Sequence, residues 1–303
     1  MDITIDNPLK DGQDLRKLRI NISDNVKKYK TLSYTTDIST LKLIFKNKTF
    51  RSTSLSSAKL NDPTEKERAG IEECAHGRFI TCFSHADHEQ INMWSMYGNA
   101  NNPVENVTLV FQNFASSEDH FKECIHTDYV LLNNCSERLY CKSDEYWNAI
   151  KRKALPICET APAGYKLDTC INHIAVFDIE YLPASSDSFH HSYSTQTSLG
   201  TSVKDTSKLG FQKINLWDCE TETRIMSVFE NQEIDSYPYV DLSLKDNIFR
   251  GLTIILNPWE EPGLLESVKK CIDKLEVSQD VKDSIVVKSS AVKGEVNLKK
   301  TEK

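Results

Sequence analysis

Two glutamates, Glu220 and Glu222, stand one residue apart in the stretch LWDCETETRIM, residues 216–226. In a helix their side chains would lie about 200° apart, whereas in an extended segment both point to the same side and can share one chemical task. The alternating stretch TRIMSVF that follows favours a strand, so we expect Glu222 near its start. Thr221 between the glutamates should then point the other way and tolerate valine.

Two other interpretations of these glutamates stay open. With Asp62 and Glu65 they could form a carboxylate cluster for magnesium, as in a metal-dependent nuclease acting on nucleic acid. Alternatively, Glu220, Glu222 and Arg224 form a salt-bridged strand face with no catalytic role.

A second group of candidate ligands lies in CAHGRFITCFSHADHE: Cys74, His76, Cys82, His85 and His88. All are plausible zinc ligands. The segment RFITCFS, however, predicts a strand in which Cys82 and Ile80 share a face, and no C-x-x-C pair accompanies it. We therefore expect structural residues and no bound metal. The count of nine cysteines is odd and no export signal is evident, which indicates reduced thiols.

The elements that must position these residues alternate between strands and helices, which predicts an α+β fold with mixed or antiparallel sheets flanked by helices. Strands are expected in LSYTT, TFRSTSL, RFITCFS, NVTLVFQNF, CIHTDYVLL, ERLYCK, HIAVFDIEYL, TRIMSVF, GLTIIL and SIVVKSS. Helices are expected in ISTLKLIFKNK, HEQINMWSMYG and DEYWNAIKRKAL. KLGFQKINLWD should begin as a helix, and Asn257 should cap a helix that Pro258 opens.

The chain organisation follows from composition. Residues 1–29 are polar and without a period, so they predict an extension, and residues 30–290 predict one domain. Residues 184–207 are rich in Ser and Thr and form either a disordered insert or a lid. Residues 291–303 form a charged tail. Asp62 in NDPTE is a good N-cap, with Pro63 at the first helical position.

Several motifs in order resemble a bacterial family catalogued as domain-of-unknown-function family 2971. They are N-D-P-x-E, M-W-x-x-Y and W-x-x-E-x-E-x-R, followed by a G-x-I-hydrophobic-x-x-P turn, across roughly residues 32–290. The motif residues are Asn61, Asp62, Pro63, Glu65, Met93, Trp94, Tyr97, Trp217, Glu220, Glu222 and Arg224.

The chain also resembles enzymes that transfer ADP-ribose from NAD, one class of which has Ser-Thr-Ser on an early strand and Glu-x-Glu on a late one. Here these are residues 52–54 and 220–222. The resemblance implies an ADP-ribosyltransferase-like fold with NAD as substrate and no metal. It implies that Glu222 holds the ribose and stabilises its developing positive charge, while Glu220 orients the nucleophile.

The same resemblance implies the residues that bind NAD. Ser52 and Ser54 would hold the carboxylates and the ribose, and Trp94, Tyr97 or Tyr34 would stack on a planar ring. The class expects an arginine where Tyr34 and Thr35 stand, and the nearest arginine is Arg51. The full set of expected binding residues is Tyr34, Arg51, Ser52, Ser54, Asn61, Asp62, Trp94, Tyr97 and Arg224.

The function that these patterns favour is a cytoplasmic ADP-ribosyltransferase or NAD glycohydrolase, such as a bacterial toxin or phage-defence component, with a protein or nucleic-acid acceptor. The alternatives are the nuclease and a non-catalytic binding module. A net charge of −7 gives no general reason for nucleic-acid binding, and no apolar window approaches the roughly 18 residues of a membrane span. We expect no membrane association.

Overall fold

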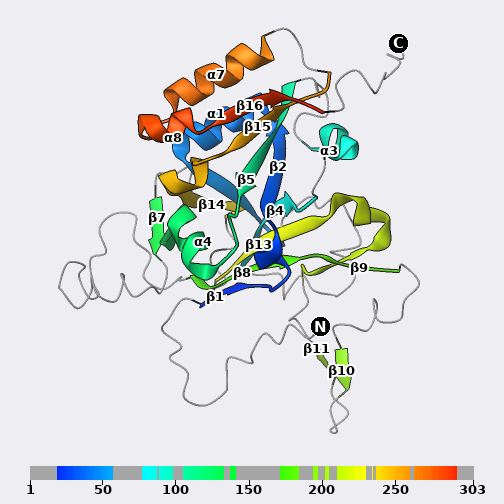
Figure 1. The fold of residues 1–303 in the computed structure, drawn as a ribbon. Coiled ribbons are helices and arrows are strands. Elements are labelled where there is room, and N and C mark those ends of the chain that lie inside the picture. The colour runs from blue at the N-terminus through cyan, green and yellow to red at the C-terminus, as the bar shows by residue number, and fades with distance from the viewer. Residues whose placement is uncertain are drawn as a thin grey trace, which may run out of the picture.

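Twelve strands form a mixed sheet that forks at β4 (Arg78–Ser84). The computed structural model describes residues 19–56, 77–86, 89–97, 105–132, 137–140, 171–183, 194–196, 202–204, 210–229, 234, 237–259 and 263–291. Together with the helices they form a single α+β domain, as the alternation of elements predicts (Figure 1).

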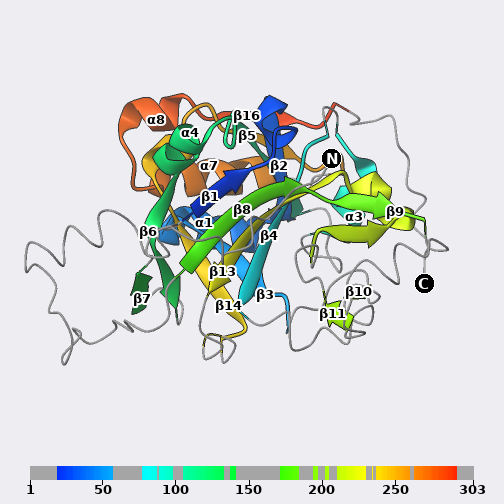
Figure 2. The ribbon, with the colours of Figure 1, turned by 90° about the horizontal axis from the view of Figure 1, so that it is seen from below.

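The longest path through the sheet runs in the order β16, β15, β5, β2, β4, β3, β14, β6, β7. Their bounds are β16 Val286–Ser289, β15 Thr253–Leu256, β5 Asn106–Gln112, β2 Thr31–Asp37, β3 Thr49–Ser54, β14 Tyr239–Leu244, β6 Ile125–Leu132 and β7 Glu137–Tyr140. A second branch leaves β4 through β13 (Glu222–Phe229), β8 (Ile171–Asp178) and β1 (Arg19–Ile22), which run side by side in Figure 2.

The fork arises because β2 and β3 share one edge of β4. β3 pairs with the start of β4, at Thr53↔Ile80 and Ser54↔Phe79, whereas β2 pairs with its end, at Ser33↔Ser84. The middle of β4 is therefore bordered by β13 along one edge, while β2 and β3 separate along the other. Side chains at this point can face a space between the strands.

Amphipathic helices cover the sheet around β15 and β16. Helix α1 (Ile38–Asn47) buries Leu41, Ile44 and Phe45, and the Asp37 carboxylate accepts a hydrogen bond from Thr40 N at 2.8 Å. It packs against α7 (Leu264–Lys274), with α8 (Gln279–Asp283) nearby (Figure 1).

The remaining elements are short. They are α3 (Ile91–Met96), α4 (Glu118–Cys124), the 3₁₀ helices η1 (Val26–Lys28), η4 (Asn215–Glu220) and η6 (Asp246–Phe249), the pair β9 (Glu180–Leu182) and β12 (Gln212–Ile214), and the hairpin β10 (Ser194–Gln196) and β11 (Ser202–Lys204). Within the described ranges no helix is both long and apolar enough to cross a bilayer.

Three details of the predicted organisation need correction. Residues 19–29 belong to the domain, because β1 pairs with β8. The segment around Lys213 is strand β12 rather than a helix, because it pairs with β9. The helix after β15 starts at Leu264, since the Asn257 side chain accepts from Trp259 N in a local turn. The described part of the Ser- and Thr-rich segment 184–207 forms the β10–β11 hairpin, and its role as a lid stays a prediction. NDPTE, DEYWNAIKRKAL and the charged tail after residue 291 lie outside the described residues.

Candidate active site at the fork of the sheet

A cavity of about 360 Å³ lies where β2 and β3 separate along β4, which is within the usual size range of ligand pockets. Its walls come from β2, α1, β3, β4, α3 and the residue after it, β12, η4 and β13. The lining residues are Ser33, Tyr34, Thr35, Thr36, Asp37, Thr40, Arg51, Thr53, Ile80, Thr81, Cys82, Phe83, Ser84, Met93, Tyr97, Lys213, Glu220, Glu222 and Arg224.

A network of buried charges forms one wall of this cavity. The Lys213 ammonium lies 2.6 Å from Glu220 Oε2 and 2.7 Å from Glu222 Oε2. Arg224 donates from Nε to Glu222 Oε1 at 2.6 Å and from Nη2 to Oε2 at 3.2 Å, while Tyr97 donates to Glu220 Oε1 at 2.6 Å. The two carboxylates and two cations balance in charge, which is the condition under which ions tolerate burial.

The neighbouring Arg224 and Lys213 keep the Glu222 carboxylate ionised. Burial alone would raise the pKa of Glu222, but Arg224 and Lys213 outweigh burial and hold its pKa at about 2. Burial, followed by the charge of Glu222, raises the pKa of the neighbouring Cys82 thiol well above its usual value. Burial and the adjacent carboxylates also raise the pKa of Tyr97, so its hydroxyl remains a donor.

The two carboxylates meet because of a turn at Thr221, and not because alternate residues of a strand share a face. Glu220 ends the 3₁₀ helix η4 and only Glu222 lies in β13, so the expectation that both stand on one extended segment is wrong. Thr221 between them adopts the left-handed conformation, with φ 43° and ψ 52°. This turn folds η4 back, so that both carboxylates reach the same ammonium.

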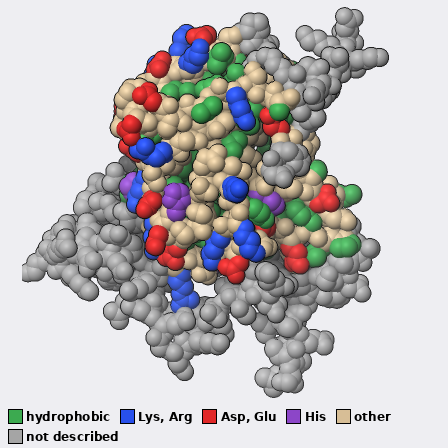
Figure 3. All heavy atoms as spheres, in the orientation of Figure 1, with side chains coloured by type: hydrophobic (Ala, Val, Ile, Leu, Met, Phe, Trp, Pro, Cys, Tyr) green, Lys and Arg blue, Asp and Glu red, His purple; other side chains and the backbone are tan. Residues whose placement is uncertain are grey.

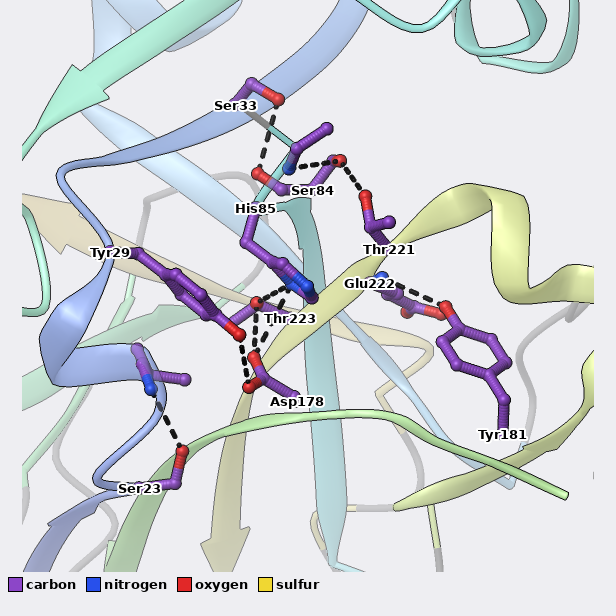
Figure 4. Close-up of polar contacts among 12 residues, drawn as sticks. Ser23, Tyr29, Ser33, Ser84, His85, Asp178, Tyr181, Thr221, Glu222 and Thr223 are labelled. Atoms are coloured by element: carbon purple, nitrogen blue, oxygen red, sulfur yellow. Dashed lines mark hydrogen bonds and ion pairs between the residues drawn. The ribbon is translucent and has the colours of Figure 1, made fainter. Parts of the chain in front are cut away.

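A separate polar cluster lies on the other side of β13 (Figure 4). Asp178 accepts hydrogen bonds from Tyr29 Oη and Thr223 Oγ1, both at 2.8 Å, and Thr223 Oγ1 lies 2.9 Å from His85 Nδ1. The rings of Tyr29 and His85 stack with their centroids 4.4 Å apart. Neighbouring residues of a strand face opposite sides, which separates Thr223 from Glu222.

Six of the residues expected at the site meet at the cavity: Tyr34, Arg51, Tyr97, Glu220, Glu222 and Arg224. The cavity does not include Ser52 or Ser54. Their hydroxyls lie instead beside Thr81 Oγ1, at 2.6 Å, and Ser56 Oγ, at 2.8 Å. Because alternate residues of a strand face opposite sides, β3 presents Arg51 and Thr53 to the cavity.

Trp94 also lies away from the cavity, with 1% of its surface exposed. Met93 and Tyr97, four residues apart on and just after α3, face the cavity instead. Trp94 therefore has no free ring face for a ligand. Asn61 and Asp62 lie outside the described residues.

No metal-binding group of three or more His, Cys, Asp or Glu side chains occurs within the part of the chain that the structure covers. Cys82 lies at the cavity and His85 in the separate polar cluster. The other three candidate zinc ligands, Cys74, His76 and His88, fall outside that part.

Lys213 is the main site residue that the sequence did not indicate. It stands in FQKINLW, where a lysine between apolar residues resembles any surface position of an amphipathic segment. The one available signal was the pair of glutamates downstream, which need a cation if they are buried.

Scans against protein-family models, curated proteins and solved structures found no match for this chain. The resemblance to domain-of-unknown-function family 2971 and to ADP-ribosyltransferases therefore stays a prediction from the motifs.

Proposed function

We propose that the cavity binds NAD and cleaves the bond between nicotinamide and ribose, passing ADP-ribose to water or to a protein or nucleic-acid acceptor. The observation that supports this is the meeting of Glu220, Glu222, Tyr34 and Arg51 in one cavity. The site would belong to an ADP-ribosyltransferase or NAD glycohydrolase of a bacterial effector, such as a toxin or phage-defence component.

The reaction requires little covalent chemistry from the protein. Nicotinamide leaves with the electrons of the glycosidic bond, and positive charge develops on the ribose ring. A buried carboxylate stabilises that charge, and a carboxylate can also accept the proton that the attacking water or acceptor hydroxyl loses. Ser33, Thr35 and Thr53 supply hydroxyls that suit the hydroxyls of a ribose.

The nuclease alternative is less well supported. Lys213 and Arg224 already neutralise both glutamates, which leaves no excess negative charge there to attract Mg²⁺. Acidic and basic side chains are also mixed over the described part of the face in Figure 3, which gives no continuous basic surface on that face for nucleic acid.

The same ion pairs favour the non-catalytic alternative, in which the cavity binds a nucleotide without cleaving it. Nicotinamide release distinguishes the two. We expect the purified protein to release nicotinamide from NAD in the presence of a chelator. The release is measured by chromatography, with and without protein and nucleic-acid acceptors. NAD binding without release would support the binding module.

A cavity-filling variant provides the control. Thr53→Tyr places a bulky ring in the cavity wall, whereas Val286→Tyr adds the same ring to an exposed edge strand, β16. We expect release to disappear in Thr53→Tyr and to persist in Val286→Tyr. Absence of release by the unmodified chain under every condition would contradict the proposed function.

A further inference from the structure

The two carboxylates of the cavity differ in how many of their acceptor positions are occupied. An ionised carboxylate has about four lone-pair sites. Glu222 accepts two hydrogen bonds from Arg224 and an ion-paired contact from Lys213 at 2.7 Å. Three of the four sites of Glu222 are therefore taken by two cations.

Glu220 has spare capacity. Its Oε1 accepts from Tyr97 Oη and its Oε2 from Lys213 Nζ, both at 2.6 Å. One lone pair on each oxygen remains, and Glu220 lines the cavity. A ribose hydroxyl or an attacking water can bind either oxygen of Glu220 without displacing any of these contacts, whereas both positions of Glu222 Oε2 are occupied and its charge is shared between two cations.

The anchoring of Glu222 extends beyond its own contacts. Arg224, which holds Glu222 through two nitrogens, also donates from Nη1 to the Gly210 carbonyl at 2.8 Å. Lys213 bridges the two carboxylates from β12, and the Glu222 amide donates to Tyr181 Oη on β9 at 2.9 Å. Glu222 therefore connects β13 to the β9–β12 pair. Lys213, which contacts both carboxylates, holds Glu220 in place next to Glu222.

We infer that Glu220 is the catalytic carboxylate that contacts the ligand, and that Glu222 with Lys213 is a positioning pair that holds Glu220 in the cavity wall. This assignment rests on the proposed function and reverses the roles that the Glu-x-Glu resemblance implies. The ribose hydroxyl donates to Glu220, and the developing positive charge lies next to its carboxylate.

The test compares Glu220→Gln and Glu222→Gln, with NAD as the probe and nicotinamide release as the readout. Glu220→Gln keeps the contacts of Glu222 with Arg224 and Lys213 but removes the buried ion pair between Lys213 and Glu220, so we expect a small fall in melting temperature and an unchanged KM. The lost charge at the reacting centre should lower kcat by roughly a hundredfold or more. Glu222→Gln removes the carboxylate that Arg224 contacts through two nitrogens as well as one partner of Lys213, so we expect a larger fall in melting temperature than in Glu220→Gln, with kcat within about tenfold when measured in the cold, where the fold persists.

Each outcome decides between the assignments. If unmodified protein releases nicotinamide but Glu220→Gln retains its kcat, the inference is overturned while the proposed function stands. The same holds if Glu222→Gln keeps its melting temperature and loses kcat a hundredfold. If Glu222→Gln does not fold, the kcat of Glu220→Gln alone decides. If the unmodified chain releases no nicotinamide at all, the proposed function fails and the assignment with it.

Discussion

Thr221 is the residue on which the geometry of the two glutamates depends. A β-branched residue at φ 43° is unusual and is retained only when its surroundings hold it there. The Thr221 carbonyl accepts from His85 N at 3.0 Å, and its hydroxyl lies 2.8 Å from Ser84 Oγ and 3.1 Å from Gln90 Nε2. These contacts fix the turn that brings Glu220 back beside Glu222.

Valine at position 221 should therefore be harmful, contrary to the expectation from strand alternation. Thr221→Val keeps the branched shape and the unusual φ but removes the hydroxyl, so we expect a loss of about 1–2 kcal/mol in the free energy of unfolding, measured with urea. The control is Thr127→Val on β6, for which we expect little change. Equal stability of the two variants would mean that the hydroxyl of Thr221 does not hold the turn.

Tyr34 offers a hydroxyl that is not bonded to any residue in the described part of the chain. Its ring packs beside Phe50 and Phe83, with centroids 5.5 and 5.6 Å away, and its hydroxyl makes no hydrogen bond to the described residues. Burial raises the pKa of Tyr34 to about 12, so the group is a neutral donor at pH 7.

Tyr34→Phe should separate ligand binding from stability. We expect an unchanged melting temperature and a severalfold higher Kd for NAD in calorimetry, because one hydrogen bond contributes about 0.5–1.5 kcal/mol. Tyr29→Phe is the matched control, since Tyr29 donates to Asp178 and lies outside the cavity lining. That variant should lose stability and keep its affinity. Unchanged NAD affinity in Tyr34→Phe would remove Tyr34 from the binding site.

At the scale of elements, the sequence predicted the strands and helices that are long enough to show a hydrophobic period. The alternation in RFITCFS and TRIMSVF gave strands β4 and β13, and the spacing of Leu41, Ile44 and Phe45 gave the buried face of α1. Strand β12 has three residues, too few for a period, and it exists because it pairs with β9 some thirty residues earlier. The position of Lys213 depends on that distant pairing, so the sequence could not indicate it.

Lys213 should hold the β9–β12 pair to the rest of the domain. Lys213→Met keeps an unbranched side chain one atom shorter but leaves two carboxylates facing each other without a cation between them. We expect a loss of about 3–5 kcal/mol in the free energy of unfolding, as is typical when one partner of a buried ion pair is removed.

A double variant tests the cause of that loss. Adding Glu220→Gln to Lys213→Met restores the charge balance, because Glu222 keeps its pair with Arg224. We expect the double variant to recover part of the stability in a double-mutant cycle measured with urea. Strictly additive losses would show that Lys213 acts by packing rather than by charge.

At the scale of the whole molecule, the forked sheet places a histidine in a row of cationic residues. The register aligns Arg19 of β1 with His173 of β8, His173 with Val228 of β13, and Val228 with Arg78 of β4. These four strands lie side by side in Figure 2. The pairing of β1 with β8 could not be predicted because the alternation in Arg19–Ile22 covers only four residues and does not indicate a partner about 150 residues away. Burial, then the charges of Arg19 and Arg78, lower the pKa of His173 to about 4.

This lowered pKa makes stability depend on pH in a defined window. In the unfolded chain this histidine is protonated below about pH 6.5, whereas in the folded protein it stays neutral down to about pH 4. Stability from His173 is therefore complete above pH 6.5 and is lost as pH falls towards 4, by up to roughly 3 kcal/mol. Glu222, with its pKa lowered from 4.5 to about 2, contributes stability that is lost over the lower window between those values.

His173→Gln separates the two windows. The variant has no proton to gain at this position, so we expect its free energy of unfolding, measured with urea at pH 7.5, 6, 5, 4 and 3, to decline less between pH 7.5 and 4 than that of the unmodified protein. Parallel curves for His173→Gln and the unmodified protein would mean that the row of Arg19, His173 and Arg78 does not control acid sensitivity. The loss below pH 4.5 should persist in His173→Gln, because it belongs to Glu222 and its partners at the other end of β13.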